Sequence, residues 1–227
     1  MVIERLLKWM LLINIFITGY SWWYYNELPT PNYYHNKFIK PPIQTKITQP
    51  SFEITAENHR YQVTPLYDYQ LEGIVVTFSN AEQFGNIWHH KRWKDFINLR
   101  DLCVIWGSNV TSGIYKNLLF SSDSWTCWVN ADSYSTWQKF NGEALSNNHL
   151  LTDSDDIKEK LMQAEIGDLI SLKGQLVKYT NLVNGYKRST SITRSDKGQG
   201  ACETIYLTSF EILKKANPTI RKAFHIF

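Results

Sequence analysis

The sequence has few of the residues and spacings from which metal and catalytic sites are usually recognised. It contains three cysteines and six histidines in 227 residues. No Cys-x-x-Cys or His-x-x-x-His spacing occurs anywhere. Structural zinc sites and redox dithiols depend on such spacings, so we expect no bound metal and no cofactor. No internal repeat and no local catalytic signature stand out.

The charge balance is also nearly even. Lysine and arginine number 24 against 21 aspartate and glutamate residues, which gives a formal net charge of +3. A charge this small excludes general attraction of the whole molecule to polyanions, so any argument from charge has to be local. The chain is 43% hydrophobic and 15% aromatic, which is enough for a packed core and excludes a disordered chain.

The longest apolar run lies at the N-terminus. Residues 9–25 carry no charge and follow Arg5 and Lys8. A helix over residues 6–25 would be about 30 Å long, which matches the hydrocarbon core of a bilayer. The aromatic residues 22–25 are typical of a membrane interface, and the basic residues before the run favour a cytoplasmic N-terminus. We therefore expect residues 1–25 to be a signal anchor; a cleaved signal peptide is the alternative.

Composition divides the rest of the chain. Residues 26–60 hold five of the seven prolines, a composition typical of an extended tether. Residues 61–213 carry the periodic apolar patterns of a globular domain, and residues 214–227 form a basic C-terminal tail. With the anchor, this order predicts a single-pass protein of the bacterial inner membrane with its C-terminal domain in the periplasm.

The globular region is expected to hold more strand than helix. Apolar alternation predicts strands over residues 69–78, 102–106, 118–130, 167–179 and 202–213. Ser79 and Glu82 match a capping box, which predicts a helix running to about Leu99. A second helix over residues 155–166 ends at Gly167, a residue type that suits the position just past a helix.

The strand over residues 167–179 is the clearest of these elements. Ile170, Leu172 and Leu176 form an apolar row that alternates with more polar residues, so this row should face the core. Gly174 falls where a strand bends sharply or another backbone passes close. We therefore expect one strongly curved strand of a small barrel.

Two motifs carry a resemblance to a known fold. A short helix feeds Gly-Asp-x-Ile-x-Leu-Lys-Gly-x-Leu-Val at residues 167–177, and Ile-x-Leu-x-x-Phe-x-Ile-Leu follows at residues 205–213. Together they resemble the last part of an OB-fold domain related to nucleic-acid-binding and anticodon-binding modules. The resemblance implies a mainly β (α+β) fold, a five-stranded barrel with inserted helices and the N-terminal transmembrane helix. The helix expected between the first two strands departs from the minimal barrel.

The resemblance also indicates where a ligand would bind. OB-folds bind oligonucleotides, oligosaccharides or proteins on one sheet face and its flanking loops, and the whole chain resembles uncharacterised membrane-anchored envelope proteins of bacteria. The loop over residues 180–200 would join the last two strands, and its cations outnumber the single acid Asp196. The candidate ligand-binding residues are Lys187, Arg188, Arg194, Lys197, Tyr186 and Trp128.

These residues predict a binding or assembly module for an anionic ligand or a protein partner. Single-stranded nucleic acid or an acidic envelope polymer would suit the cations and the aromatic groups, whereas a partner in an envelope complex would dock elsewhere on the barrel. The alternative is a solvated loop that binds no ligand and whose charges only keep it soluble. A hydrolytic enzyme is the rival class; it would bring His89, His90, His149 or a cysteine within hydrogen-bond reach of one another in a pocket.

The cysteines allow one disulfide in an extracytoplasmic domain. Cys103 lies in an apolar stretch where a free buried thiol is comfortable. Cys127 and Cys202 have more polar or glycine-rich flanks, so we expect a Cys127–Cys202 disulfide.

Overall fold

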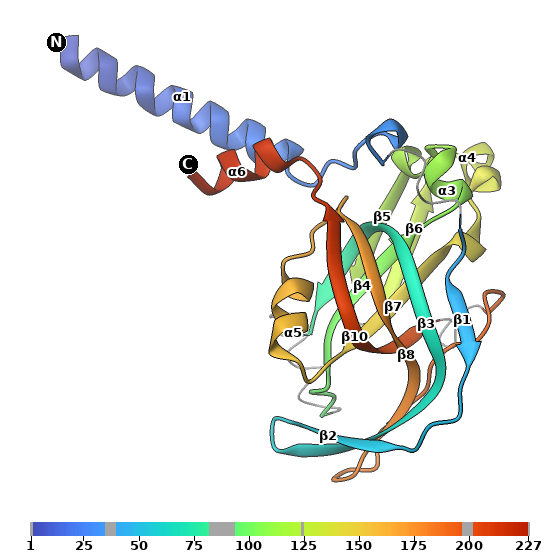
Figure 1. Ribbon diagram of the computed structural model, residues 1–227. Helices are drawn as coiled ribbons and strands as arrows, with labels where there is room; N and C mark the ends of the chain where they lie inside the picture. The colour runs from blue at the N-terminus through green and yellow to red at the C-terminus, as the bar shows by residue number, and fades with distance from the viewer. Residues whose placement is uncertain (1, 35–39, 82–93, 124, 197–201, 227) are drawn as a thin grey trace.

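The computed structural model describes residues 2–34, 40–81, 94–123, 125–196 and 202–226 and is mainly β (Figure 1). The strands are β1 (Ile43–Lys46), β2 (Phe52–Ala56), β3 (His59–Asn80), β4 (Asn98–Ile105), β5 (Leu118–Asp123), β6 (Thr126–Ala131), β7 (Leu145–Leu151), β8 (Leu169–Asn181), β9 (Lys187–Arg188) and β10 (Glu203–Lys214). The helices are α1 (Val2–Tyr24), α3 (Ser108–Thr111), α4 (Tyr134–Lys139), α5 (Asp155–Met162) and α6 (Pro218–Ile226). Three 3-10 turns are η1 (Pro31–Tyr34), η2 (Ile114–Asn117) and η3 (Gly142–Ala144).

Five strands close into a ring. β3 pairs antiparallel with β4 and β8, and β4 pairs antiparallel with β7. β10 lies between β7 and β8, parallel to the first and antiparallel to the second. Apolar side chains from all five strands fill the interior, and the expected row of Ile170, Leu172 and Leu176 is among them. The expectation that this row faces the core is confirmed.

Gly174 lies where two backbones of the ring approach closely. A Cβ atom built on Gly174 would lie 2.2 Å from Tyr206 O and 3.0 Å from Leu207 Cα. The β8–β10 register also shifts between Leu207 and Ser209, directly beyond this contact. The expected close approach at Gly174 is therefore confirmed, and it lets β8 and β10 lie close together within a small ring.

The proline-rich segment contributes two strands to the sheet, where an extended tether was expected. β1 and β2 both pair antiparallel with β3. Tyr34 of η1 is buried, and its hydroxyl donates a hydrogen bond to Gly167 O at 2.7 Å. The prolines do not prevent this pairing because Pro41, Pro42 and Pro50 precede the two strands and remove no ladder donor.

The capping-box prediction is wrong at its start. Ser79 and Asn80 are the last residues of β3, and they pair with Asp101 and Arg100 of β4. Leu99, the expected end of that helix, belongs to β4. The capping-box pattern is a local signal that favours a helix only weakly, and pairing with β4 outweighs it here. The middle of the expected helix, with His89 and His90, lies outside the described residues.

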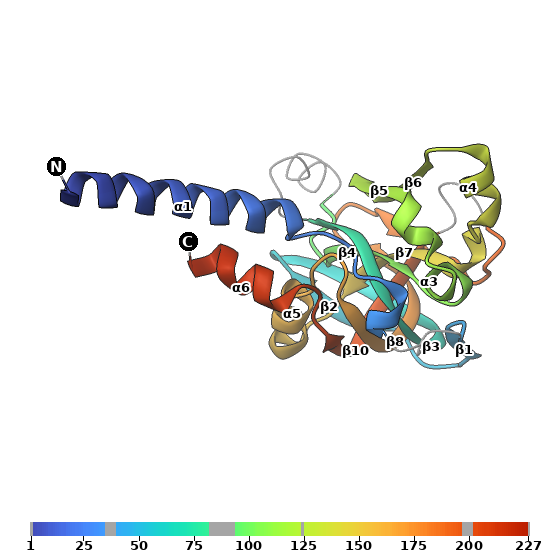
Figure 2. The ribbon, with the colours of Figure 1, turned by 90° about the horizontal axis from the view of Figure 1, so that it is seen from above.

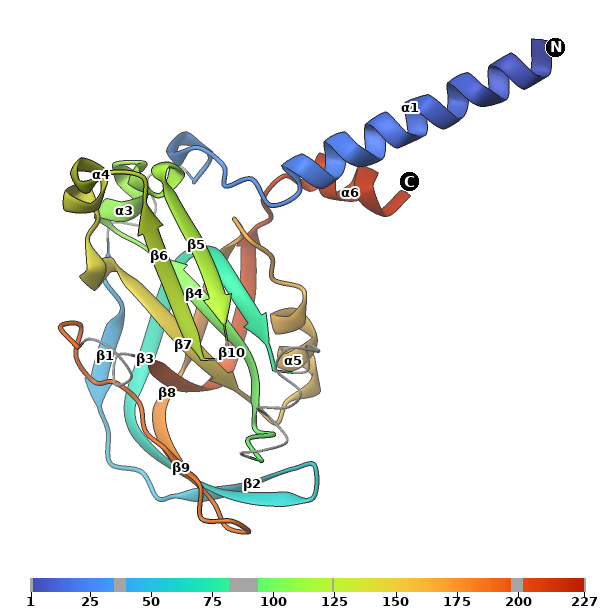
Figure 3. The same ribbon diagram turned by 180° about the vertical axis from the view of Figure 1, so that it is seen from behind.

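The expected strand over residues 118–130 is a hairpin. β5 and β6 pair with each other, and Trp125 takes a positive φ of 64° in the turn between them. This hairpin covers the outer face of the ring (Figure 3), where Ser122 Oγ donates to Thr77 Oγ1 of β3 at 3.1 Å. The third strand of the ring is instead β7, which sequence patterns missed because its centre, residues 146–149, is polar and resembles a turn.

A disulfide joins the hairpin to the ring. It links Cys103 of β4 to Cys127 of β6, with a Cα–Cα distance of 6.0 Å, and Cys202 is free. The expected Cys127–Cys202 pairing is therefore wrong. Leu102 and Val104 point into the ring, so Cys103 points outward and meets the hairpin.

Two helices extend together from one end of the ring (Figures 1 and 2). The expected basic tail contains α6, which lies beside the base of α1 and brings the rings of Tyr25 and Phe224 to 5.2 Å. Asn217 Nδ2 donates to Glu27 O at 2.6 Å. In the described part of the chain, no helix combines the length and the apolar character that crossing a bilayer requires.

Candidate functional site

Charged and polar side chains gather on the outer face of β4, β7 and the start of β10. Leu102 of β4 and Leu150 of β7 belong to the ring interior, so their neighbours Asp101 and His149 face outward and are paired in the register. We call Asp101, Asn147, His149, Arg188 and Cys202 the face cluster. Although it is on the outer face, the described loops cover it, and His149 is fully buried.

Asp101 and His149 form the centre of the face cluster. His149 Nδ1 lies 2.7 Å from Asp101 Oδ1, which also accepts a hydrogen bond from Asn98 Nδ2 at 2.8 Å. Burial by itself would raise the pKa of Asp101, but the charge and hydrogen bond of His149 lower it below its ordinary value. Burial would lower the pKa of His149, but Asp101 raises it above its ordinary value. The pair is thus an acid and a base that favour each other's charged forms.

Arg188, a predicted ligand residue, is a member of this buried network. Its guanidinium contacts His149 Nε2 and lies over the Trp125 ring at 4.7 Å. The Tyr186 ring stacks on the same tryptophan with centroids 6.3 Å apart. A guanidinium can only donate, so this contact is made by the neutral imidazole with its proton on Nδ1, facing Asp101. Protonation of Nε2, which Asp101 favours, would oppose the contact, and the charge of Arg188 accordingly acts to lower the pKa of His149. Arg188 therefore fastens the loop between β8 and β10 to the ring and to the hairpin turn.

A second buried acid, Asp95, lies near Arg188 and favours its charged form. Tyr179 donates to Asp95 Oδ1 at 2.6 Å, and Asp95 is fully buried. Burial raises the pKa of Asp95, while the hydrogen bond from Tyr179 and the charge of Arg188 act in the opposite direction. Burial lowers the pKa of Arg188, but Tyr179, Asp101 and Asp95 together raise it above its ordinary value. Arg188, which is half-buried, is consequently held as a cation.

Arg194, another predicted ligand residue, pairs with a different acid. It forms an ion pair with Glu203 of β10, which is 1% exposed. Glu203 faces the ring interior, as Ile205 does two residues later. Burial raises the pKa of Glu203 to about 7, and the charge of Arg194 lowers it only in part. Glu203 Oε2 has no hydrogen-bond partner within the described residues, which is consistent with the dominance of burial.

The raised pKa of Glu203 predicts a pH dependence of stability. The folded state keeps the Glu203 proton up to about pH 7, whereas the unfolded chain releases it near the ordinary value of 4.5. The contribution is therefore fully present below pH 4.5 and is lost as the pH rises to about 7. In urea titrations at pH 4.5 and 7.5, we expect Glu203→Gln to gain stability relative to the parent as the pH rises. An unchanged difference between the two proteins at both pH values would contradict this.

The remaining predicted residues are not part of the face cluster. Lys187 is exposed on β9, and Trp128 is 55% exposed on the outward face of β6. Lys197 lies outside the described residues. The structure thus brings Tyr186 and Arg188 together around Trp125, a residue that was not predicted for the site, and places Arg194 elsewhere.

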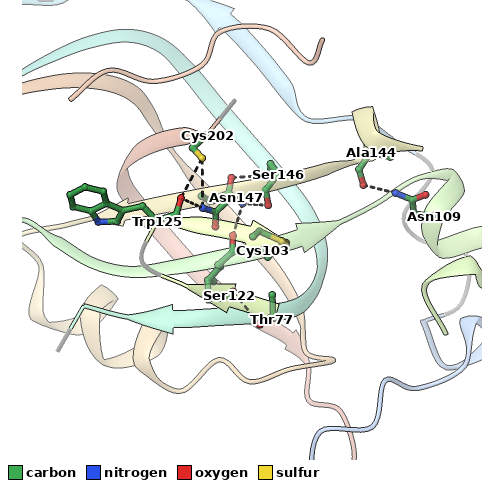
Figure 4. The surroundings of a disulfide bond; sticks show 12 residues. Thr77, Cys103, Asn109, Ser122, Trp125, Ala144, Ser146, Asn147 and Cys202 are labelled. Carbon is green, nitrogen blue, oxygen red and sulfur yellow. Dashed lines mark hydrogen bonds between the residues drawn. A yellow bond between two sulfur atoms is a disulfide. The ribbon is translucent and has the colours of Figure 1, made fainter. Parts of the chain in front are cut away.

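Cys202 is half-buried at the edge of the face cluster. Asn147 Nδ2 donates to Cys202 Sγ at 3.7 Å, and the thiol donates to Trp125 O at 3.7 Å (Figure 4). Cys202 also interacts with His149 and contributes, after Asp101, to raising the pKa of the imidazole. Two side chains named for the enzyme alternative, His149 and Cys202, therefore lie within reach of each other. Spacing along the sequence could not show this because the residues belong to β7 and to the approach to β10.

Comparisons with protein-family models, with curated proteins and with solved structures find no match. Within the described residues, no three histidine, cysteine, aspartate or glutamate side chains are placed to hold a metal ion.

Proposed function

We propose that the chain is a membrane-anchored OB-fold module that binds a protein partner in a bacterial envelope assembly. The fold assignment is supported by the order of the five strands around the ring. β3, β4, β7, β8 and β10 serve as strands one to five, the first pairs with the second and the fourth, and the fifth lies parallel to the third. Such a five-stranded Greek-key ring, with α5 between its third and fourth strands, is the arrangement expected of an OB-fold.

The usual OB-fold ligand face is occupied by the protein's own groups. That face lies on the second and third strands, which are β4 and β7 here, and on loops that include the one between β8 and β10. Arg188 in this loop compensates the buried acids Asp101 and Asp95, and Arg194 is bonded to Glu203. Drawing Arg188 away toward a polyanion would leave buried charge uncompensated, at a cost of several kcal/mol, and drawing Arg194 away would break its contact with Glu203. A grip on an anionic ligand through these two arginines is therefore the weaker proposal.

The hairpin side offers a surface better suited to a protein. β5, β6 and α4 form a lobe, and Leu119, Trp128, Tyr134 and Trp137 of this lobe are exposed large side chains. Trp128 and Leu119 share the outward face of the β5–β6 hairpin, in line with the predicted role of Trp128. Exposed aromatic groups of this kind are enriched at protein interfaces.

The anchor proposal has its support in α1. This helix has 23 residues, and most of its apolar side chains have no protein covering. Large apolar groups exposed to water on this scale are unfavourable, and insertion into lipid would remove the cost. Although α1 does not have the apolar character of a typical spanning helix, we propose that these exposed side chains enter the lipid and hold the ring domain at the periplasmic side of the inner membrane.

A site-specific crosslinking experiment tests the partner proposal. The full chain is expressed in a bacterial envelope with a photo-crosslinking residue at position 128 on the lobe or at position 183, an exposed control in the turn after β8. We expect position 128 alone to crosslink a defined protein, and we expect Trp137→Ala to abolish that adduct. The purified full chain is then titrated with single-stranded DNA at low salt. Salt-sensitive DNA binding without an adduct at position 128 would replace the protein partner with a polyanion.

A further inference from the structure

The three cysteines meet around one hairpin. Cys103 and Cys202 lie on opposite sides of Asn147, which belongs to β7. Cys103 of β4 is paired with Asn147 in the register, and Cys202 lies beside Asn147 just before β10. Cys127 is bonded to Cys103 from the hairpin above. The Cys202 thiol contacts the carbonyl of Trp125, which is two residues before Cys127 (Figure 4). The side chain of Asn147 and the turn between β5 and β6 thus lie between the free thiol and the disulfide.

We propose that Cys202 is the nucleophile of an internal thiol–disulfide exchange site. The Cys202 thiolate attacks Sγ of Cys127, an S–S bond forms between these two residues, and the Cys103–Cys127 bond breaks. Cys103 leaves as a thiolate and takes up the proton that Cys202 released. Electrons and atoms balance without an external oxidant, because one disulfide and one thiol are present before and after the step.

The face cluster supplies what this attack requires. The thiolate is the attacking form of cysteine, and nearby cations and a proton acceptor favour it. His149 interacts with Cys202, and Asp101 holds Nδ1 of the imidazole. Nε2 would therefore take the Cys202 proton once its contact with Arg188 opens, as in nucleophile–base–carboxylate arrangements. The Arg188 cation contacts the same imidazole. We place the attack on Sγ of Cys127, because Cys202 contacts the hairpin turn beside Cys127, whereas β7 lies between β10 and β4 and separates the backbones of Cys202 and Cys103.

The exchange would change where the lobe is attached. The hairpin is tied to β4 by Cys103 in the present structure, and it would be tied to the start of β10 afterwards. Trp128 follows Cys127 directly, so the outward face of the lobe would shift with the bond. The inference does not depend on what binds that face.

The direct experiment removes the present partner of Cys127. Full-length Cys103→Ser is reduced, reoxidised with oxidised glutathione and mapped by non-reducing peptide analysis, with circular dichroism to check the fold. We expect a Cys127–Cys202 disulfide. The matched control is Cys127→Ser, which leaves Cys103 and Cys202 about 10 Å apart across β7, beyond the reach of a disulfide. Two free thiols in folded Cys103→Ser, or equally ready crosslinking in the control, would overturn the proposal.

The role of His149 has a separate readout. In the Cys103→Ser background, we expect His149→Gln to slow formation of the Cys127–Cys202 bond at least about tenfold near pH 7 and to move the pH profile of the rate toward higher pH. An unchanged rate and profile would show that His149 has only a structural role.

The wild-type chain provides the measurement if Cys103→Ser fails to fold. Samples held at pH 8 are quenched in acid at intervals, unfolded, alkylated and mapped. We expect peptides joined through Cys127 and Cys202 together with alkylated Cys103. If only the Cys103–Cys127 linkage and alkylated Cys202 are found at every time, the exchange does not occur.

Discussion

Replacing Gly174 with alanine is expected to lower the free energy of unfolding by about 3 kcal/mol. The new Cβ would lie 2.2 Å from Tyr206 O and 3.0 Å from Tyr206 C, and these are backbone atoms that cannot rotate away as a side chain does. β8 and β10 would have to separate at the point where β10 crosses, which would disturb the packed interior of the ring. Urea unfolding followed by tryptophan fluorescence measures the change, and a thermal midpoint lower by about 6–12 °C should accompany it.

Gly142→Ala is the matched control for this substitution. A Cβ atom built on Gly142 would have no heavy atom within 4 Å, and Gly142 is not among the glycines with positive φ. We expect the free energy of unfolding of this variant to stay within about 0.5 kcal/mol of the parent. If Gly174→Ala is as stable as Gly142→Ala, the close approach of β8 and β10 does not limit the fold.

The parts of the fold that sequence patterns predicted are those with local causes. The β8 row of Ile170, Leu172 and Leu176 alternates cleanly, and a glycine inside it signals a close backbone. α5 begins after Ser154 as predicted, but it ends at Met162 with Gln163 as its C-cap. The prediction that Gly167 lies just past the helix end is therefore wrong; Gly167 instead takes a φ of 85° directly before β8. These features depend on side-chain period and backbone freedom, which neighbouring residues largely determine.

The parts that patterns missed depend on distant contacts. β7 carries polar residues on both faces because Ser146 and Asn148 bond to each other while Asn147 and His149 meet other elements. No alternation of apolar and polar residues could mark such a strand. The disulfide was misassigned for a related reason: the apolar neighbours of Cys103 face the ring interior, and this leaves its thiol on the side covered by the hairpin.

The contacts of the face cluster could not be predicted from sequence patterns either, because its residues are also distant from one another in the chain. Four cations in one loop suggested an open anionic site, since each cation was counted without its partners. Arg188 and Arg194 instead bond to groups on β7 and β10 that are 39 and 9 positions away in the chain. Exposure of Trp128, by contrast, follows from strand alternation within a short hairpin and could be anticipated.

A buried carboxylate joins the helical end of the molecule to the ring. Asp168 is fully buried, and its Oδ1 accepts hydrogen bonds from Ala216 N at 2.7 Å and from Arg221 Nη1 of α6 at 2.6 Å. Its Oδ2 accepts from Glu165 N at 3.0 Å. Arg221 also donates to Ile166 O. One side chain thus fixes the approach to β8, the end of β10 and the helix beside α1.

Asp168→Ala is therefore expected to lower the free energy of unfolding by about 3–5 kcal/mol, because it leaves Arg221 as a buried cation without its counter-charge. Denaturant titration of the detergent-solubilised full chain measures this loss. The control is Glu53→Ala, which removes an ion pair with Arg60 whose side chains are 50% and 65% exposed; its cost should stay below about 1 kcal/mol. Adding Arg221→Met to Asp168→Ala removes the unpaired charge as well, so the double variant should recover part of the loss. Equal losses in Asp168→Ala and Glu53→Ala would show that the buried pair does not hold α6 and the ring together.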